Sequence, residues 1–151
     1  MARTATIGHT NSGNCWEITG GTKTQREMVD KVTKWFIEKY LPRYRTLCIY
    51  TKLTSIRKQG AEGYCMAEDD YRTFEIEIEK DMSLYDLCCT VIHELIHVKQ
   101  YARKEMTYKN GKTYWKGRDC TDKDYWDQPW EKEAFKLQDQ YTVDMWKDNI
   151  L

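Results

Sequence analysis

Residues 90–101 of the chain read Thr-Val-Ile-His-Glu-Leu-Ile-His-Val-Lys-Gln-Tyr. They contain the pattern His-Glu-x-x-His, in which His93 and His97 stand four residues apart and Glu94 follows the first histidine. Because an α-helix has about 3.6 residues per turn, the two histidines share one face and can bind the same metal ion. A zinc ion held in this way needs a third protein ligand and keeps one position for a water molecule, which Glu94 can deprotonate.

The residues around this pattern have the spacing of an amphipathic helix, which opens at the capping-box-like Ser83-x-x-Asp86 and extends to about Lys104. His93, Glu94 and His97 lie on the flank opposite its apolar stripe. The stripe consists of Leu84, Leu87, Cys88, Val91, Ile92, Leu95 and Ile96. A solvated flank would carry more Lys and Glu, and core histidines would lie within the stripe. The pattern therefore favours a metal site over an ordinary surface or core histidine pair.

Length and composition predict one globular domain covering residues 1–151. The 24 basic and 24 acidic residues balance, so net charge provides no general attraction to nucleic acid or membranes. No apolar run approaches the ~18 residues of a membrane helix, and the first residues lack the apolar core of a signal peptide. The six cysteines show no Cys-x-x-Cys spacing and are expected to be reduced. We therefore expect a cytoplasmic protein with no membrane partner.

Local signals along the chain predict an α+β fold. Residues 1–22 read as irregular apart from a short strand at 15–19, and a capping box at Thr24-x-x-Glu27 opens a helix that Pro42 ends. Strand-like runs at 46–53, 63–67 and 72–79 are expected to form a short, mostly antiparallel sheet. In the last run apolar and acidic residues alternate, which places one face in water and discourages edge-to-edge pairing.

Two further signals lie after the histidine helix. Asn110-Gly111 stands between β-forming residues and predicts a hairpin turn. Pro129 suits the first turn of a final helix, which is expected to extend to about Trp146.

The third metal ligand has few candidates. His9 is the only other histidine and stands in the irregular N-terminal segment. Gln100 and Arg103 occupy the positions that would be Gly and His in the His-Glu-x-x-His-x-x-Gly-x-x-His class, which excludes that class. A carboxylate from the last helix is the remaining option, and Glu131 and Glu133 are the candidates.

Glu131 is favoured over Glu133. Since the two residues point roughly 200° apart on a helix, only one of them can face the metal. Ala134 lies on the same face as Glu131, and a small residue there allows two helices to approach closely. The alternative is that both glutamates merely form an acidic first turn that complements the helix dipole.

These residues resemble the gluzincin group of zinc metallopeptidases. That group combines His-Glu-x-x-His with a glutamate helix in which the ligand often stands three residues before Ala, as Glu131 does before Ala134. The order of elements over residues 24–146 is similar to minimal single-domain gluzincins and to SprT-like proteins, including phage-encoded ones. The resemblance implies a zincin-like domain with an N-terminal helix, a short sheet, an active-site helix and a C-terminal glutamate helix.

The sequence departs from these families in two respects. Many SprT-like proteins carry a C-terminal zinc ribbon, and this chain has no paired Cys-x-x-Cys. Many gluzincins have Asp four residues after the ligand glutamate, where this chain has Phe135. The carboxylate that usually orients the first histidine must therefore come from another position or be absent.

The resemblance implies zinc-dependent hydrolysis of peptide bonds in a peptide or protein substrate, with Glu94 as general base. The oxyanion needs a hydrogen-bond donor, for which Tyr101, Tyr114 and Tyr125 are candidates. The resemblance also implies that an edge strand near residues 74–78 lies beside the cleft, where an extended peptide can pair with it.

Two other functions remain open. Zinc could be a structural clip in a binding or inhibitory module, although such a site has no need of Glu94. Alternatively, the protein could be a SprT-like protease that acts on proteins bound to nucleic acid. The balanced charge offers this little support unless basic residues cluster, and the candidates are Arg43, Arg45, Arg57, Lys58, Lys109, Lys112, Lys116 and Arg118.

Overall fold

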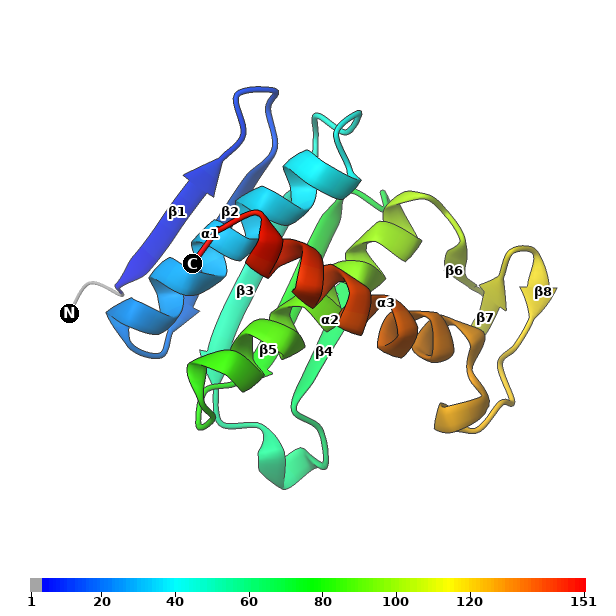
Figure 1. Cartoon of the computed structure of the whole chain (residues 1–151). Coiled ribbons are helices and arrows are strands. Elements are labelled where there is room, and N and C mark those ends of the chain that lie inside the picture. The colour runs from blue at the N-terminus through cyan, green and yellow to red at the C-terminus, as the bar shows by residue number, and fades with distance from the viewer. Residues whose placement is uncertain (1–3) are drawn as a thin grey trace.

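The α+β class is confirmed by the computed structural model, which describes residues 4–151 and contains three α-helices and a mixed sheet in that range (Figure 1). The helices are α1 (Lys23–Tyr40), α2 (Leu84–Ala102) and α3 (Pro129–Lys147). The main sheet consists of β1 (Ala5–His9), β2 (Cys15–Gly20), β3 (Cys48–Thr54), β4 (Gly63–Ala67) and β5 (Thr73–Glu79). A small second sheet consists of β6 (Met106–Lys109), β7 (Lys112–Trp115) and β8 (Arg118–Asp119).

The main sheet has the order β1-β2-β3-β5-β4, and its two central pairings, β2 with β3 and β3 with β5, are parallel. The prediction of a mostly antiparallel sheet is therefore wrong for this sheet. Residues 5–9, expected to be irregular, form β1 and pair antiparallel with β2. α1 lies between β2 and β3 in the sequence and forms the crossover connection between these two parallel strands.

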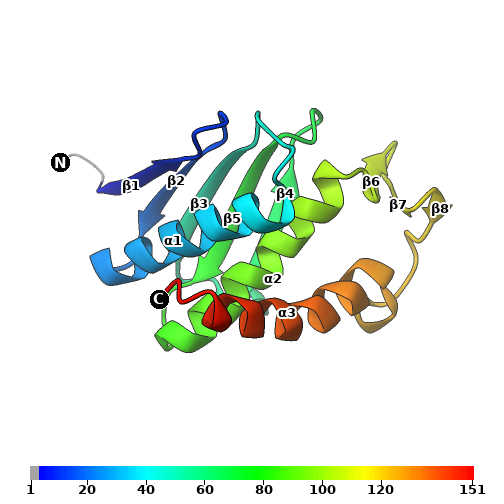
Figure 2. The ribbon, with the colours of Figure 1, turned by 45° about the horizontal axis from the view of Figure 1, so that its top comes forward.

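α1 and α2 cover one face of the sheet, and α3 packs on the side of these helices that faces away from the sheet (Figure 2). The core between the layers includes Phe36 of α1, Phe74 of β5 and Ile92 of α2, which are fully buried. Tyr141 of α3 stacks on Tyr40 of α1 with ring centroids 3.8 Å apart. α3 is thus joined to the rest of the domain through both other helices.

The start of α1 lies two residues from the predicted position. Thr22, rather than Thr24, is the N-cap, and its hydroxyl accepts a hydrogen bond from the Gln25 N–H at 3.1 Å. Gln25 completes the capping box through its side-chain oxygen, which accepts from the Thr22 N–H at 2.9 Å. The helix ends at Tyr40, shortly before Pro42, as predicted.

Strand β5 shows the predicted alternation but is not an edge strand. Phe74, Ile76 and Ile78 point into the core, whereas Glu75 and Glu77 lie on the opposite face. β5 lies between β3 and β4, so the edge beside the histidine helix is β4. The third acidic residue, Glu79, is buried rather than solvated.

The C-terminal elements follow their local signals. Asn110 and Gly111 both have positive φ angles, 54° and 76°, as the turn between β6 and β7 requires. Pro129 occupies the first turn of α3, which ends at Lys147. Within residues 4–151, no helix has the length and apolar character needed to cross a membrane. The six cysteines are free thiols.

Candidate metal centre

α2 and α3 bring the side chains of His93, His97 and Glu131 to one point. Glu131 Oε1 lies 2.6 Å from His97 Nε2 and 3.1 Å from His93 Nε2. The three potential ligand atoms all lie within 4.8 Å of one another, and each side chain is buried. The group can therefore hold a metal ion through two imidazole nitrogens and one carboxylate oxygen.

The first turns of α3 place Glu131, and not Glu133, toward the histidines. Ala134, one turn after Glu131, is fully buried in the contact between the two helices, where a larger side chain would separate them. Glu133 points away from the histidines, and its carboxylate accepts a hydrogen bond from Gln100 Nε2 at 3.2 Å.

Amide oxygens orient both histidines. His93 Nδ1 lies 2.8 Å from Gln138 Oε1, and His97 Nδ1 lies 2.8 Å from Gln100 Oε1. Since an amide oxygen can only accept, each Nδ1 carries a proton and donates it to its glutamine, and each Nε2 faces Glu131, where it can bind a metal ion when it carries no proton. Gln100 also donates from Nε2 to the Trp130 carbonyl at 3.0 Å, which joins α2 to the first turn of α3.

Gln138 is the functional residue that the sequence reasoning missed. It stands seven residues after Glu131, two helical turns along the same face of α3, so helical spacing alone could have identified it. Phe135, at the position where many gluzincins have Asp, packs its ring against His93 at a centroid distance of 4.6 Å. The partner of His93 is therefore an amide on the following turn.

The charges of this cluster shift the pKa values of His97 and Glu131. Burial opposes protonation of His97, but the hydrogen bond with Glu131 and the charges of Glu94 and Glu131 outweigh it and raise the pKa of His97 to about 9. Burial also opposes ionisation of Glu131, yet both histidines hold the pKa of this carboxyl well below its usual range. With no cation between them, His97 and Glu131 thus form an ion pair at neutral pH.

Glu94 lies beside the three ligands and is only 4% exposed. Burial raises the pKa of this carboxyl; His97 and His93 oppose the rise, and Glu131 contributes to it to a smaller extent. Within residues 4–151, the Glu94 carboxylate has no hydrogen-bond partner. It faces strand β4 at Gly63, where an added Cβ would lie 3.1 Å from Glu94 Oε2. Glycine at this position leaves the room that the carboxylate occupies.

Two cavities open beside Glu94 and His93. The smaller, about 220 Å³, is also lined by His97, Glu131 and residues of β4. The larger, about 460 Å³, is walled by Trp126 and Phe135, whose rings stack 5.5 Å apart. The site therefore combines buried polar groups with an aromatic wall.

Of the three tyrosines considered as oxyanion donors, two lie at the site and one does not. Tyr101 and Tyr125 both line the smaller cavity, and Tyr125, in the short 3-10 helix Tyr125–Asp127, also lines the larger one. Burial, followed by the charge of Glu131 and a hydrogen bond with it, raises the pKa of Tyr125. Tyr114 lies on β7 and lines neither cavity. The structure thus brings two of the three tyrosines to the site.

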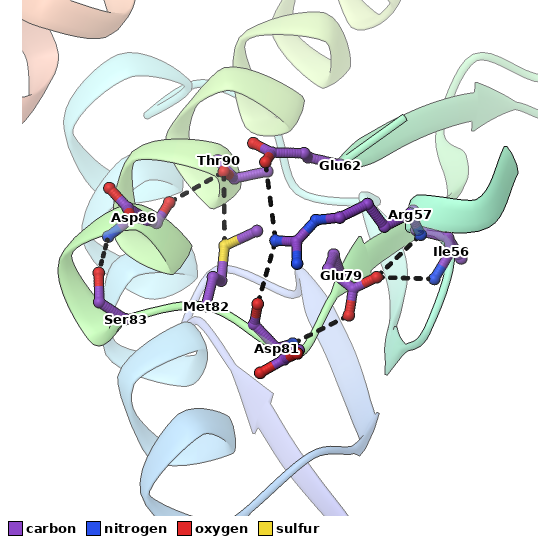
Figure 3. A network of polar contacts seen from close by, with 9 residues as sticks. All are labelled: Ile56, Arg57, Glu62, Glu79, Asp81, Met82, Ser83, Asp86 and Thr90. Carbon is purple, nitrogen blue, oxygen red and sulfur yellow. Dashed lines mark hydrogen bonds and ion pairs between the residues drawn. The ribbon is translucent and has the colours of Figure 1, made fainter. Parts of the chain in front are cut away.

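The rim of the larger cavity is anchored by the buried carboxylate of Glu79 (Figure 3). It accepts hydrogen bonds from the backbone N–H groups of Ile56, Arg57 and Asp81 at 3.0, 2.8 and 2.9 Å, and these donors hold the pKa of Glu79 below its usual range. The Arg57 guanidinium in turn donates to the Asp81 carbonyl at 3.0 Å and lies 3.7 Å from the carboxylate of Glu62, a rim residue. This network fixes the segment between β3 and β4 to the start of α2.

Comparison of the chain with models of protein families, with curated proteins and with solved structures finds no match. The chemistry of the site must therefore be inferred from its geometry. Two imidazoles and a carboxylate suit zinc and other divalent transition metals.

Removing the charge of Glu131 should impair metal binding, whereas the same change at Glu133 should not. We expect purified wild-type protein and Glu133→Gln to retain one metal ion per chain, and Glu131→Gln to bind it about 10- to 1,000-fold more weakly, because an amide is a poorer ligand than a carboxylate. Elemental analysis and titration with a chromophoric chelator measure both quantities. Equal loss in the two variants would contradict the assignment of Glu131.

Metal binding should strengthen as the pH rises. A metal ion must displace the proton from His97, so the affinity should rise about tenfold per pH unit between pH 6 and 8 and level off near the pKa of about 9. Chelator competition across this range measures the slope. The Glu94→Gln variant cannot release a proton from the Glu94 carboxyl, so it serves as the control and should retain the slope. An affinity independent of pH would show that metal binding displaces no proton from His97.

Proposed function

We propose that the chain is a zinc-dependent peptidase of the gluzincin kind, in which His93, His97 and Glu131 hold the metal. The observation that carries this proposal is the position of Glu94. The residue is only 4% exposed, it forms no hydrogen bond through its carboxylate within residues 4–151, and it lines two cavities beside the metal ligands. A purely structural metal site has no need of such a group, which favours catalysis over a binding module with a structural zinc.

Zinc at this centre would supply activation of a water molecule and polarisation of the scissile carbonyl. Glu94 accepts the proton of the attacking water and later delivers it to the leaving amine. Its raised pKa suits both roles, because a carboxyl titrating closer to neutrality exchanges a proton more readily than an ordinary one. Gln100 and Gln138 keep the histidines in the tautomer that this arrangement requires.

Tyr125 is the favoured donor to the oxyanion. It lines both cavities, whereas Tyr101 lines only the smaller one and packs its ring against Tyr71 and Phe74 at centroid distances of 6.2 and 6.3 Å. A hydroxyl with a raised pKa remains protonated and can donate a hydrogen bond to developing negative charge.

Strand β4 offers a place for the substrate backbone. It is the last strand of its sheet, and Gly63, Tyr64 and Cys65 line the smaller cavity. An extended peptide that added a strand at this edge would pass beside Glu94. The neighbouring aromatic wall of Trp126 and Phe135 would then accept a bulky apolar side chain close to the scissile bond.

Glu94→Gln should abolish proteolysis without loss of metal. The change preserves the size of the side chain but removes the proton acceptor, so we expect the cleavage rate of an unfolded protein substrate to fall by about 10²- to 10⁴-fold. Metal content measured on the same sample separates loss of the base from loss of the cofactor. Proteolysis by the variant at the wild-type rate would exclude Glu94 as the base, and metal binding without proteolysis in the wild type would favour the structural-zinc alternative.

Trp126→Ala should weaken the preference for bulky apolar residues near the cleaved bond. Loss of one wall of an apolar subsite should lower kcat/KM by about 10- to 100-fold for such sites and leave the metal content unchanged. Cleavage sites mapped by mass spectrometry and steady-state kinetics provide the measurement. Trp146→Ala, which removes an exposed tryptophan of α3 that lines neither cavity, is the matched control. The same preference in both variants would exclude this wall as a subsite.

A further inference from the structure

Figure 2 shows the end of the domain where α1 and α2 finish and where β3 and β5 begin, and residues of this end line a further cavity. It is a cavity of about 630 Å³ that shares no residue with the two cavities of the metal centre. Arg43, Arg45, Arg72 and Arg103 line it, and we refer to it as the arginine cavity. The parallel crossover explains why these arginines lie together, because it places the C-terminal end of a helix next to the first residues of the following strand.

The positive charge of the arginine cavity is only partly balanced by the protein, through the electrostatic interaction of Asp70 with Arg72. No acidic residue lines it, and none of its four arginines forms an ion pair within residues 4–151. By contrast, Arg57, Lys112 and Lys116, which were considered for a basic patch, each pair with a carboxylate at other places on the surface. Four unpaired guanidinium groups in one concavity therefore stand out in a chain with zero net charge.

The ends of α1 and α2 account for only part of this charge. A helix C-terminus carries about half a negative elementary charge, so two of them offset about one of the four positive charges. Arg72 is the residue that satisfies a helix end, since it donates to the Ala102 carbonyl at 3.2 Å. The side chains of Arg43, Arg45 and Arg103 are exposed and form no hydrogen bond within the described residues. Three guanidinium groups thus remain available to a ligand.

The floor of the cavity is held in place. Arg72 also donates to the Tyr71 carbonyl at 3.2 Å and lies over the ring of Tyr44 with its guanidinium carbon 4.8 Å from the ring centroid. The Tyr44 hydroxyl donates to the same Ala102 carbonyl at 3.2 Å. These contacts preorganise one guanidinium, so that a bound anion needs to order only the others.

We propose that the arginine cavity binds a phosphate-bearing anion with at least two phosphoryl groups. Guanidinium groups bind phosphate oxygens in pairs, and several of them together match an anion that carries more than one phosphate charge. The volume falls within the range of small-ligand sites. The source of the phosphates is either a free oligophosphate or the backbone of a nucleic acid. This inference does not depend on the proposed peptidase activity, because the two sites share no residue.

The test compares two double variants that remove the same formal charge. Arg43→Gln/Arg45→Gln alters the cavity, and Lys23→Gln/Lys31→Gln alters exposed lysines of α1 outside it. The probes are inorganic triphosphate, followed by calorimetry, and a fluorescein-labelled single-stranded oligodeoxynucleotide of 12 residues, followed by anisotropy. We expect the arginine variant to bind at least about tenfold more weakly, with a salt dependence reduced by roughly one to two ion equivalents, and the lysine variant to change less than twofold.

Either probe can support the inference. Tight binding of triphosphate identifies a free oligophosphate as the source, and binding of the oligonucleotide alone identifies a nucleic-acid backbone. If the wild-type protein binds neither triphosphate nor the oligonucleotide at low salt, the proposal is overturned. Unchanged binding by the arginine variant would also overturn it, because phosphate bound at the metal centre would survive this substitution. Arg72→Lys, which keeps the charge but loses the guanidinium fork, should weaken binding as well, and thermal melts verify that each variant is folded.

Discussion

The contact of one carboxylate with two imidazoles determines how α2 and α3 cross. Taking Glu131 and two histidines out of water costs several kcal/mol for each charge unless they are paired, so these side chains can be buried only together. The fully buried Ala134 allows the helices to approach closely enough for the pairing to form. At the other end of α3, Met145 and Tyr141 pack into the apolar core. The helix is thus held by a polar cluster at one end and by apolar contacts at the other.

The polar flank of α2 is an interface in its own right. Gln100 is fully buried although it lies away from the apolar stripe, because it bonds at the same time to His97 and to the first turn of α3. Every polar atom of its amide therefore has a role in the site, which is the condition under which a buried polar group does not destabilise a fold. A helix with one apolar flank and one polar flank whose groups are paired across the contact can accordingly be buried on both sides.

Elements with strong local signals could be predicted from the sequence. Ser83 accepts a hydrogen bond from the Asp86 N–H at the start of α2, Asn110-Gly111 forms the hairpin turn, and Pro129 opens α3. The placement of Glu131 rather than Glu133 also followed from helical spacing and from the small residue at Ala134. All of these inferences depend on residues fewer than five positions apart, where geometry is set by the backbone itself.

The features that were missed depend on contacts between distant segments. The pairing of residues 5–9 with β2, the parallel entry of β3 and the edge position of β4 are set by topology, which local alternation does not specify. Gln138 was missed for a different reason. The resemblance directed attention to carboxylates as partners of His93, whereas the structure uses a neutral amide from the next turn of α3.

The neutral amides have an electrostatic consequence for the centre. Gln100 and Gln138 fix the histidines without adding negative charge, so Glu94 and Glu131 are the two carboxylates whose charges act on one another within it. The proton that Glu131 holds on His97 offsets one of them and leaves the other unbalanced. Burial raises the pKa of Glu94, the two histidines oppose this rise, and Glu131 adds a smaller contribution that raises it. A divalent cation would replace that proton and balance both charges. The charge of the cluster, and not only the identity of its ligands, thus favours an ion of charge +2.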